Sequence, residues 1–238
     1  MAIGSFLSMA DAMKKAVAFV GPSFAGNIPE DVFSENVFLC PPVRRGDLGR
    51  LAPSISSVLI IDGVFHSALA VSAREILNTL RRGVTVYGSS SMGALRAAEL
   101  DEFGMVGVGK VYQMYKSGEA ESDAEVALIF DEESFVPLSE PLVNIRHSVA
   151  KAVERACLLP TDGDQIISRA KTLRYHDLTF ETLFDLLSVH MAPGKLAPYR
   201  QFVRHHLAEM DLKRRDAIEL AEYFKAYSGR SIFESDAS

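Results

Sequence analysis

Polar side chains that could do chemistry follow four short apolar runs in the first hundred residues. In chain order they are Ser23, Arg44, Asp62 with His66, and the three serines Ser89–Ser91. Hydroxyl, carboxylate and imidazole groups are the side chains that nucleophilic and general acid–base catalysis require. They can act together only if the fold brings the ends of the four runs to one place.

The three serines have the sharpest local pattern, in the segment YGSSSMGALRAAEL. An apolar strand is predicted to turn tightly there and to continue into a helix over 92–100. Ser89-x-Ser91-x-Gly93 resembles a nucleophile elbow, with Ser89 where the usual pattern has glycine. Ser91 would then be a nucleophile or an oxyanion-site residue, because a helix N-terminus presents free N–H groups. A helix N-cap and an anion pocket without covalent chemistry fit the same residues.

Asp62 closes an apolar run, where a buried carboxylate needs a partner. We expect Asp62 and His66, four positions apart, to act as general base and as the group that orients it. An Asp-Gly pair also forms a simple turn, and a loop histidine also faces solvent, so both structural alternatives stay open. For Arg96, a surface ion pair with Glu99 is the alternative to substrate binding. The side chains expected to shape the substrate pocket are Ser23, Arg44, Ser90 and Arg96.

The apolar runs predict the sheet that must position these residues. Residues 16–21, 37–42, 58–63 and 84–89 are continuously apolar and rich in β-formers, as strands covered on both faces are. Between the third and fourth runs, Ala73, Ile76, Leu77 and Leu80 recur at helical spacing. This alternation predicts an α/β fold with a doubly wound, mostly parallel sheet, whose polar loops meet at one edge.

The second half of the chain predicts a different organisation. Residues 126–143 indicate a β-hairpin with DEES as its turn, and apolar stripes at helical spacing follow. We therefore predict an α/β core domain over residues 1–143, hairpin included, and a helical extension over 144–238 packed on that core. Asn144 and Arg146, at the boundary, are expected to support the pocket. The cluster Lys213–Arg215 is expected on a solvated helix face.

Composition limits the classes of function. The 238 residues are 48% hydrophobic and 24% charged, which suits a buried core. With 25 Lys and Arg against 31 Asp and Glu, the net charge is −6, which argues against general nucleic-acid binding. Two distant cysteines, no signal-peptide pattern and no membrane-spanning stretch favour a cytoplasmic protein. No metal-ligand spacing, Walker A or GxGxxG motif is present, so we expect neither metal nor cofactor, and the oligomeric state stays open.

Several stretches together resemble the TfuA-like family, the partner proteins of YcaO enzymes in peptide backbone thioamidation. The stretches span about residues 19–146 in the family's order, and SMGALRAAEL followed by FGMVGVG is the most specific of them. The full set is VGPSF, PPVRRGDL, IIDGVF, EIL, GSSSMGALRAAEL, FGMVGVGKVY, DAEVAL and SEPLVNIR.

The resemblance implies sulfur handling. It implies a metal-independent hydrolase that acts on a thiocarboxylated ThiS-type sulfur carrier and releases sulfide for the YcaO enzyme. Such hydrolysis is acyl chemistry, which suits Ser91 as nucleophile, or a water activated by Asp62 or His66.

Two departures from the family pattern keep a second function open. The chain has Ala73–Arg74 and Ile129–Phe130 where the family commonly has a histidine. If either histidine is the family's general base, this chain uses His66 or His147 instead or is catalytically weak. The alternative is a non-catalytic adaptor that docks the carrier protein or a precursor peptide onto YcaO.

Overall fold

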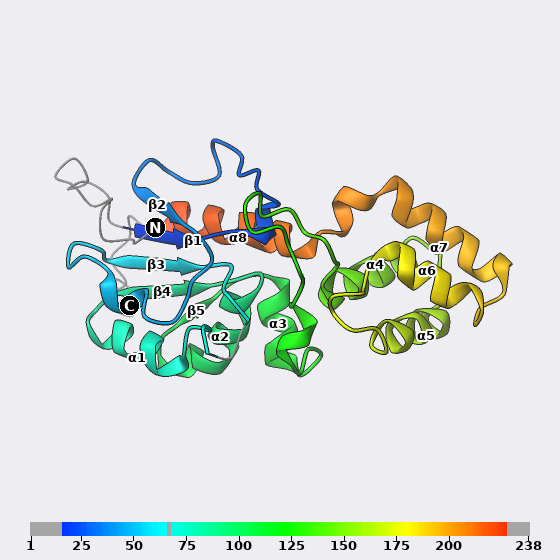
Figure 1. Cartoon of the computed structure of the whole chain (residues 1–238), viewed down its shortest axis with the longest axis horizontal. Coiled ribbons are helices and arrows are strands. Elements are labelled where there is room, and N and C mark those ends of the chain that lie inside the picture. Colours follow the sequence, from blue (N-terminus) through cyan, green and yellow to red (C-terminus); the bar gives the residue numbers. More distant parts are fainter. Residues whose placement is uncertain (1–15, 66–67, 228–238) are drawn as a thin grey trace, which may run out of the picture.

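A computed structural model describes residues 16–65 and 68–227 of the chain. Within them, five parallel strands form one sheet in the order β2-β1-β3-β4-β5, with helices on both faces (Figure 1). The strands are β1 (Ala16–Phe19), β2 (Val37–Cys40), β3 (Ser57–Ile60), β4 (Thr85–Gly88) and β5 (Val106–Gly107). The predicted α/β fold is confirmed: β1, β2 and β4 fall inside three of the apolar runs, and β3 begins one residue before the remaining run.

The strand register brings the carboxyl ends to one edge of the sheet. Phe19 lies opposite Ile60, and Ile60 lies opposite Gly88, so β1, β3 and β4 end level with one another. Beyond the strands, Val43 and Gly63 form an isolated parallel bridge between the segments that follow β2 and β3. The loops after β1, β3 and β4 therefore start side by side.

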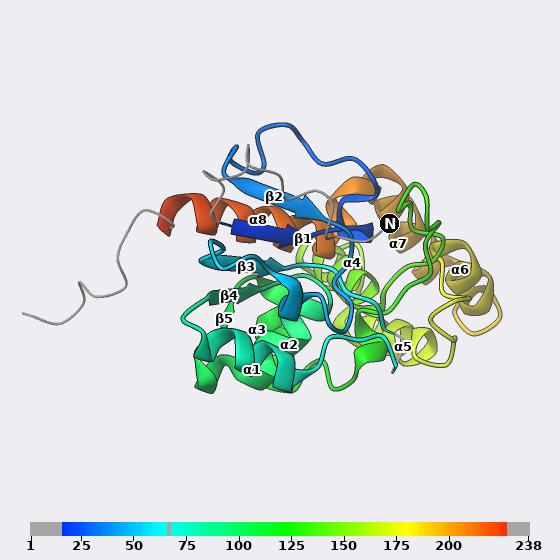
Figure 2. The ribbon, with the colours of Figure 1, turned by 60° about the vertical axis from the view of Figure 1, so that its left-hand side comes forward.

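Each face of the sheet has its own helices and its own core (Figure 2). Helices α1 (Ala73–Arg81) and α2 (Met92–Leu100) cover one face, where Ile76 and Ala97 pack with Val58 and Val86. The last helix, α8 (Leu212–Tyr227), covers the other face. There its apolar stripe packs on strand residues, the stripe being Ala217, Leu220, Ala221 and Phe224.

The middle of the chain forms a helical unit beside the sheet (Figure 1). It consists of α4 (Leu142–Glu154), α5 (Pro160–Ala170), α6 (Phe180–Ser188) and α7 (Pro193–His205), which enclose a separate core around Ile166, Leu183 and Tyr199. Helix α3 (Lys110–Ser117) packs between α2 and α8. Short 3-10 segments lie at Pro22–Phe24, Leu48–Arg50, Asp101–Phe103, Asp123–Glu125 and Leu207–Met210.

The β-hairpin predicted at 126–143 is reduced to one antiparallel bridge, between Phe130 and Pro137. Neither arm forms a strand: Phe135 has a positive φ of 57°, Pro137 and Pro141 lack the N–H that a ladder needs, and α4 begins at Leu142. The segment closes on itself as a loop, with Asp131 N–H donating to the carbonyl of Val136.

Candidate functional site

The turn between β4 and α2 is built by two glycines that lie against each other. A Cβ on Gly93 would lie 1.7 Å from the carbonyl oxygen of Ile60, and one on Gly88 would lie 2.2 Å from the carbonyl oxygen of Gly93. Helix α2 therefore starts directly on the sheet. Ser90, midway between the glycines, has a φ of +65°, a left-handed conformation that is uncommon for any residue with a side chain.

The carboxylate of Asp62 is held at the end of β3 by the loop after β1. Oδ2 accepts hydrogen bonds from the backbone N–H of Gly21 at 2.8 Å and of Ser23 at 3.1 Å, and Oδ1 accepts the Ser23 hydroxyl at 2.7 Å. The adjacent ends of β1 and β3 make these contacts possible. Asp62 is 2% exposed, so these bonds replace water around the carboxylate.

Ser90 joins this carboxylate through a second hydroxyl. Its Oγ lies 2.7 Å from Oγ of Ser23. Because Ser23 has one hydroxyl proton and gives it to Asp62, Ser90 is the donor in the bond between the two serines. Ser90, Ser23 and Asp62 thus form a chain of hydrogen bonds, called the serine relay below, that directs the Ser90 proton toward the carboxylate.

A buried lysine provides the counter-charge to the relay. Lys213, in the first turn of α8, is 2% exposed, and its Nζ donates to the carbonyl of Val126 at 3.1 Å. Burial raises the pKa of Asp62 above its usual range, and the Lys213 ammonium together with the Ser23 and Gly21 bonds opposes that rise. Burial likewise lowers the pKa of Lys213, and Asp62 opposes that change.

The relay itself is closed to solvent, and a cavity lies beside it. Ser23 is 1% exposed and Ser90 is not exposed at all. The cavity, called the edge cavity below, has a volume of about 520 Å³ and lies between the loops of the sheet and the helical unit. Its walls include Pro22, Leu128, Glu140, Asn144, Leu207 and Lys213. Pro22 and Lys213 are the two points at which the cavity wall meets the surroundings of Asp62.

Comparison with protein families gives a match over residues 62–179 to the TfuA-like proteins. The chain belongs to the TfuA-like family. That membership supports a role as a partner protein of a YcaO enzyme. Comparison with curated proteins gives no match. The matched segment of this TfuA-like chain includes Asp62, Ser90 and Asn144, whereas Ser23 and Lys213 lie outside it.

The structure of this TfuA-like chain brings together Ser23, Asp62 and Ser90 among the residues singled out in the sequence. Ser91 is their neighbour: it is 2% exposed, stands at the N-cap of α2, and its side chain makes no capping hydrogen bond. The backbone places Ser90, one position earlier than the sequence pattern indicates, at the centre of the turn. His66 lies outside the described residues.

Arg44 and Arg96, two of the three arginines named from the sequence, form no hydrogen bond with the relay residues in the described part of the chain. Arg96 donates to Glu99 at 2.6 Å and to the carbonyl of Val71 at 3.1 Å, which is the ion-pair alternative. Arg44 is exposed, and its backbone N–H donates to Asp47.

The two residues at the predicted domain boundary have structural partners. Arg146 forms a bidentate ion pair with Glu125, with both N–O distances 2.8 Å and both side chains largely buried. Asn144 lines the edge cavity, and its Oδ1 accepts the backbone N–H groups of Leu212 and Lys213. Asn144 therefore fixes the start of α8 and, with it, the position of Lys213.

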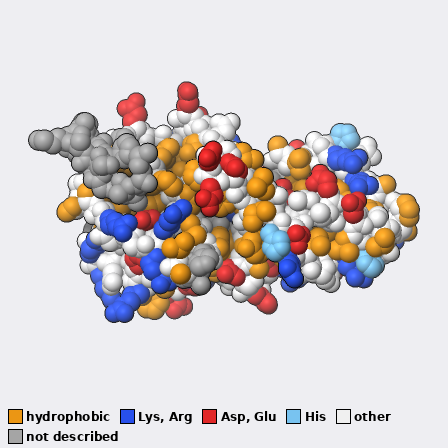
Figure 3. Space-filling view, viewed as in Figure 1, with side chains coloured by type: hydrophobic (Ala, Val, Ile, Leu, Met, Phe, Trp, Pro, Cys, Tyr) orange, Lys and Arg blue, Asp and Glu red, His pale blue; other side chains and the backbone are white. Residues whose placement is uncertain are grey.

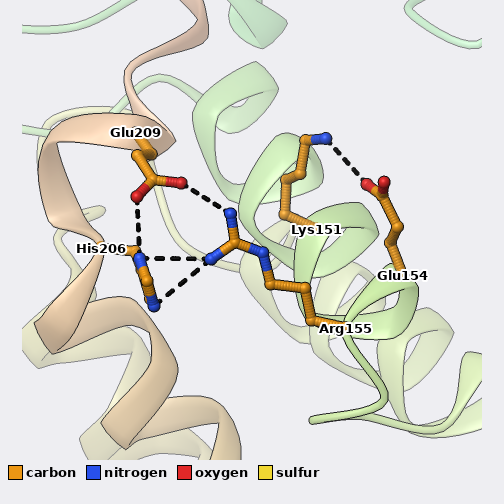
Figure 4. Close-up of polar contacts among 5 residues, drawn as sticks. All are labelled: Lys151, Glu154, Arg155, His206 and Glu209. Atoms are coloured by element: carbon orange, nitrogen blue, oxygen red, sulfur yellow. Dashed lines mark hydrogen bonds and ion pairs between the residues drawn. The ribbon is translucent and has the colours of Figure 1, made fainter.

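His147, the other histidine considered as a base, lines a second groove of about 570 Å³ between α4 and α8. Burial and the nearby Arg215 and Lys151 lower the pKa of His147. Charged groups bordering this groove bind one another, as Figure 4 shows: Arg155 donates to Glu209 at 2.9 Å. The same Glu209 lies 2.8 Å from Nδ1 of His206.

Sequence reasoning missed two buried charges in α8. Lys213 was expected on a solvated face, and the structure buries it against the ends of the strands. Asp216 is also fully buried, and its Oδ2 accepts the N–H of Val111 at 2.6 Å, at the start of α3. The spacing of Lys213 and Asp216 with Ala217 and Leu220, three to four residues apart on one helical face, is the signal that could have found them.

Two absences hold for residues 16–65 and 68–227, the part of the chain that the structure describes. Within it, His, Cys, Asp and Glu side chains form no group of three placed to hold a metal ion. In the same part, every helix is too short or too polar to span a lipid bilayer.

Proposed function

We propose that this TfuA-like chain hydrolyses the C-terminal thiocarboxylate of a ThiS-type sulfur carrier and supplies the sulfide to its YcaO partner. The observation that carries the proposal is the serine relay, in which Ser90 is held with a positive φ and points its proton toward Asp62. The net reaction converts RCOS⁻ and water into RCOO⁻ and H₂S. We place it in the cytoplasm, where reducing conditions suit free sulfide.

The relay supports a covalent route. Oγ of Ser90 attacks the carbonyl carbon while its proton passes through Ser23 to Asp62, whose raised pKa makes it a better base than an exposed carboxylate. The positive end of α2 stabilises the tetrahedral oxyanion. The C–S bond then breaks, and the sulfur leaves as HS⁻ after taking up the proton from Asp62; the second proton of H₂S comes from the product carboxylic acid when it ionises to RCOO⁻ after the hydrolysis step. Water, deprotonated by Asp62, cleaves the acyl-serine ester and restores Ser90.

Two variations use the same residues. In one, Asp62 activates a water that attacks the carbonyl directly, so that no ester forms. In the other, Ser91 rather than Ser90 is the nucleophile or oxyanion-site residue. We favour Ser90 because its hydroxyl, and not that of Ser91, bonds to the relay.

The test is sulfide release from a purified, thiocarboxylated carrier. We expect Ser90→Ala and Asp62→Asn each to lower the rate by at least about 100-fold, the lower end of what a positioned base contributes. Ser117→Ala, at an exposed helix end, serves as the control and should leave the rate unchanged. Release that persists in both relay variants would reject the proposal, and loss in Ser91→Ala alone would move the nucleophile to Ser91.

A second candidate function is the adaptor that docks the carrier or a precursor peptide onto YcaO. The full burial of Ser90 favours it, as do the exposed apolar side chains of Ile129, Val136 and Leu138 on the loop beside the sheet. Co-purification decides between the two functions. If the chain is an adaptor, the wild-type protein binds YcaO and the carrier together but releases no sulfide.

A further inference from the structure

The edge cavity is placed and sized to hold a short stretch of extended chain. Its lining residues come from the loop after β1, the segment 128–141, the start of α6 and the start of α8. Much of its wall is apolar, from Pro22, Leu128, Phe180 and Leu207 among others. A volume of about 520 Å³ falls among small-ligand pockets, roughly 300–1,000 Å³, so it takes a few residues and not a folded domain.

Most polar groups of its wall are already bound by the protein. Asn144 bonds to Glu140 at 3.1 Å and to the N–H of Leu212 at 3.0 Å. Arg214 donates to the carbonyl of Phe24 at 2.9 Å, and its guanidinium also lies over the Phe24 ring. These groups shape the cavity and are not free to bind a ligand.

Lys213 differs from them. An ammonium has three N–H donors, and among the described residues the Lys213 ammonium has one hydrogen-bond partner, the carbonyl of Val126. A nearly buried cation with two remaining donors is costly unless an anion or water completes its shell. Three carboxylates attract the Lys213 ammonium at longer range, those of Asp62, Asp211 and Glu140, but none of them forms an ion pair with it.

We propose that the edge cavity binds the C-terminal tail of the carrier, with the terminal thiocarboxylate or carboxylate against the Lys213 ammonium and the preceding residues along the apolar wall. This inference rests on the proposed function for the identity of the ligand. It also gives that function a route, because Pro22 lines the cavity and its neighbours Gly21 and Ser23 hold Asp62. Pro22 is thus the wall residue that adjoins the relay residue Ser23 in the chain.

The binding test uses no turnover. The probe is a fluorescein-labelled decapeptide with the last ten residues of the ThiS-type carrier, made with a free C-terminal carboxylate and as the C-terminal amide, and followed by fluorescence anisotropy. We expect the wild-type chain to bind the acid at least about tenfold more tightly than the amide, the effect of one charged hydrogen bond. This comparison requires no variant, so it does not depend on how a substitution folds.

Two variants locate the binding. Lys213→Met should lose the preference for the acid and bind both peptides with the weak affinity of the amide. Leu207→Trp, which narrows the cavity, should weaken both peptides, whereas Leu159→Trp, at an exposed leucine outside it, should weaken neither. Equal affinity of acid and amide for the wild-type chain, no binding of either, or no effect of Leu207→Trp would each overturn the inference.

The outcome is distinguishable from a failure of the proposed function. Binding that depends on Lys213, without sulfide release that depends on Ser90, keeps the tail site and rejects the hydrolase. If sulfide release depends on Ser90 but peptide binding is unchanged by the substitutions at Lys213 and Leu207, the hydrolase is kept and the tail site is rejected.

Discussion

At the scale of single residues, Ser90 combines a hydroxyl on the relay with a backbone conformation that glycine would adopt more easily. A positive φ is strained for serine and for alanine alike. The fold imposes this positive φ because Gly88 and Gly93 let α2 approach the strands so closely that the turn between them must be tight. This arrangement predicts opposite orders of stability at two neighbouring serines.

We expect Ser90→Gly to be more stable than Ser90→Ala by about 1 kcal/mol, because both lack the hydroxyl and only glycine relieves the positive φ. At Ser89, whose φ is not positive, Ser89→Ala should be at least as stable as Ser89→Gly. Urea unfolding of the four variants measures this. The same order at both positions would show that the conformation of Ser90 is not the cause.

Removal of the Lys213 charge should change the pH dependence of sulfide release. Asp62 must be ionised to act as a base, so activity falls as the pH drops through its pKa, which burial raises and Lys213 lowers. Lys213→Met removes the positive charge, so the pKa of Asp62 rises further and the acid limb of the pH profile moves to higher pH.

The control for this profile is Lys151→Met, which removes a lysine that pairs with Glu154 at the surface. We expect its acid limb to coincide with that of the wild type. An unmoved limb in Lys213→Met would mean that a group other than Asp62 is the base. Profiles of kcat/KM are the measurement, because they report the free enzyme.

At the scale of elements, the contact between α2 and the sheet positions the site. Gly93→Ala would drive a methyl group into the carbonyl of Ile60, so we expect a loss of several kcal/mol or no folded protein at all. Gly194→Ala, also near the start of a helix, meets open space and should be neutral or stabilising by up to about 1 kcal/mol. Thermal unfolding compares the two, and equal effects would contradict the role given to Gly93.

Much of this arrangement was predictable from the sequence. Continuous apolar runs predicted β1 to β4, and parallel topology then placed Ser23, Asp62 and Ser90 at one edge. The exact turn residue was not predictable, because Ser89, Ser90 and Ser91 are chemically identical and only the backbone distinguishes them. The strand β5 has two residues, too few for a periodic signal.

At the scale of the whole molecule, the packing of α8 on the sheet could not be predicted from the sequence. Its apolar stripe was visible, but nothing local indicates that it packs on a sheet whose strands end more than a hundred residues earlier. For that reason Lys213 was expected on a solvated face, and Asp216 was not singled out. The face of the molecule drawn in Figure 3 has hydrophobic, acidic and basic side chains interspersed, and basic side chains gather at the end near α1.

Asp216 gives the molecule a pH-dependent term in stability. Burial raises its pKa to about 6, and one of its oxygens has no hydrogen-bond partner in the described structure. The folded state then holds this proton more tightly than the unfolded state, so the contribution of Asp216 is present below pH 4 and is lost as the pH rises to about 6.

We expect Asp216→Asn to become more stable relative to the wild type as the pH rises from 4 to 7, by up to about 3 kcal/mol. Urea unfolding across that range measures the difference. Asp131→Asn is the control: hydrogen bonds from Ser134 lower the pKa of Asp131, so its contribution is lost only below about pH 4, and the difference between this variant and the wild type should stay nearly constant over that range. A difference that does not vary with pH in Asp216→Asn would show that this carboxyl is not the source.

The return of α8 to the sheet has a consequence for how the protein is made. During translation, the strands leave the ribosome first, with one face of the sheet bare until the final helix emerges. The apolar side chains of Leu59 and Tyr87 are therefore exposed for most of the synthesis of the nascent chain. Chaperones are needed during that time to prevent aggregation through this face. A truncated product that ends before Leu212 would lack both the cover for that face and the cation beside Asp62.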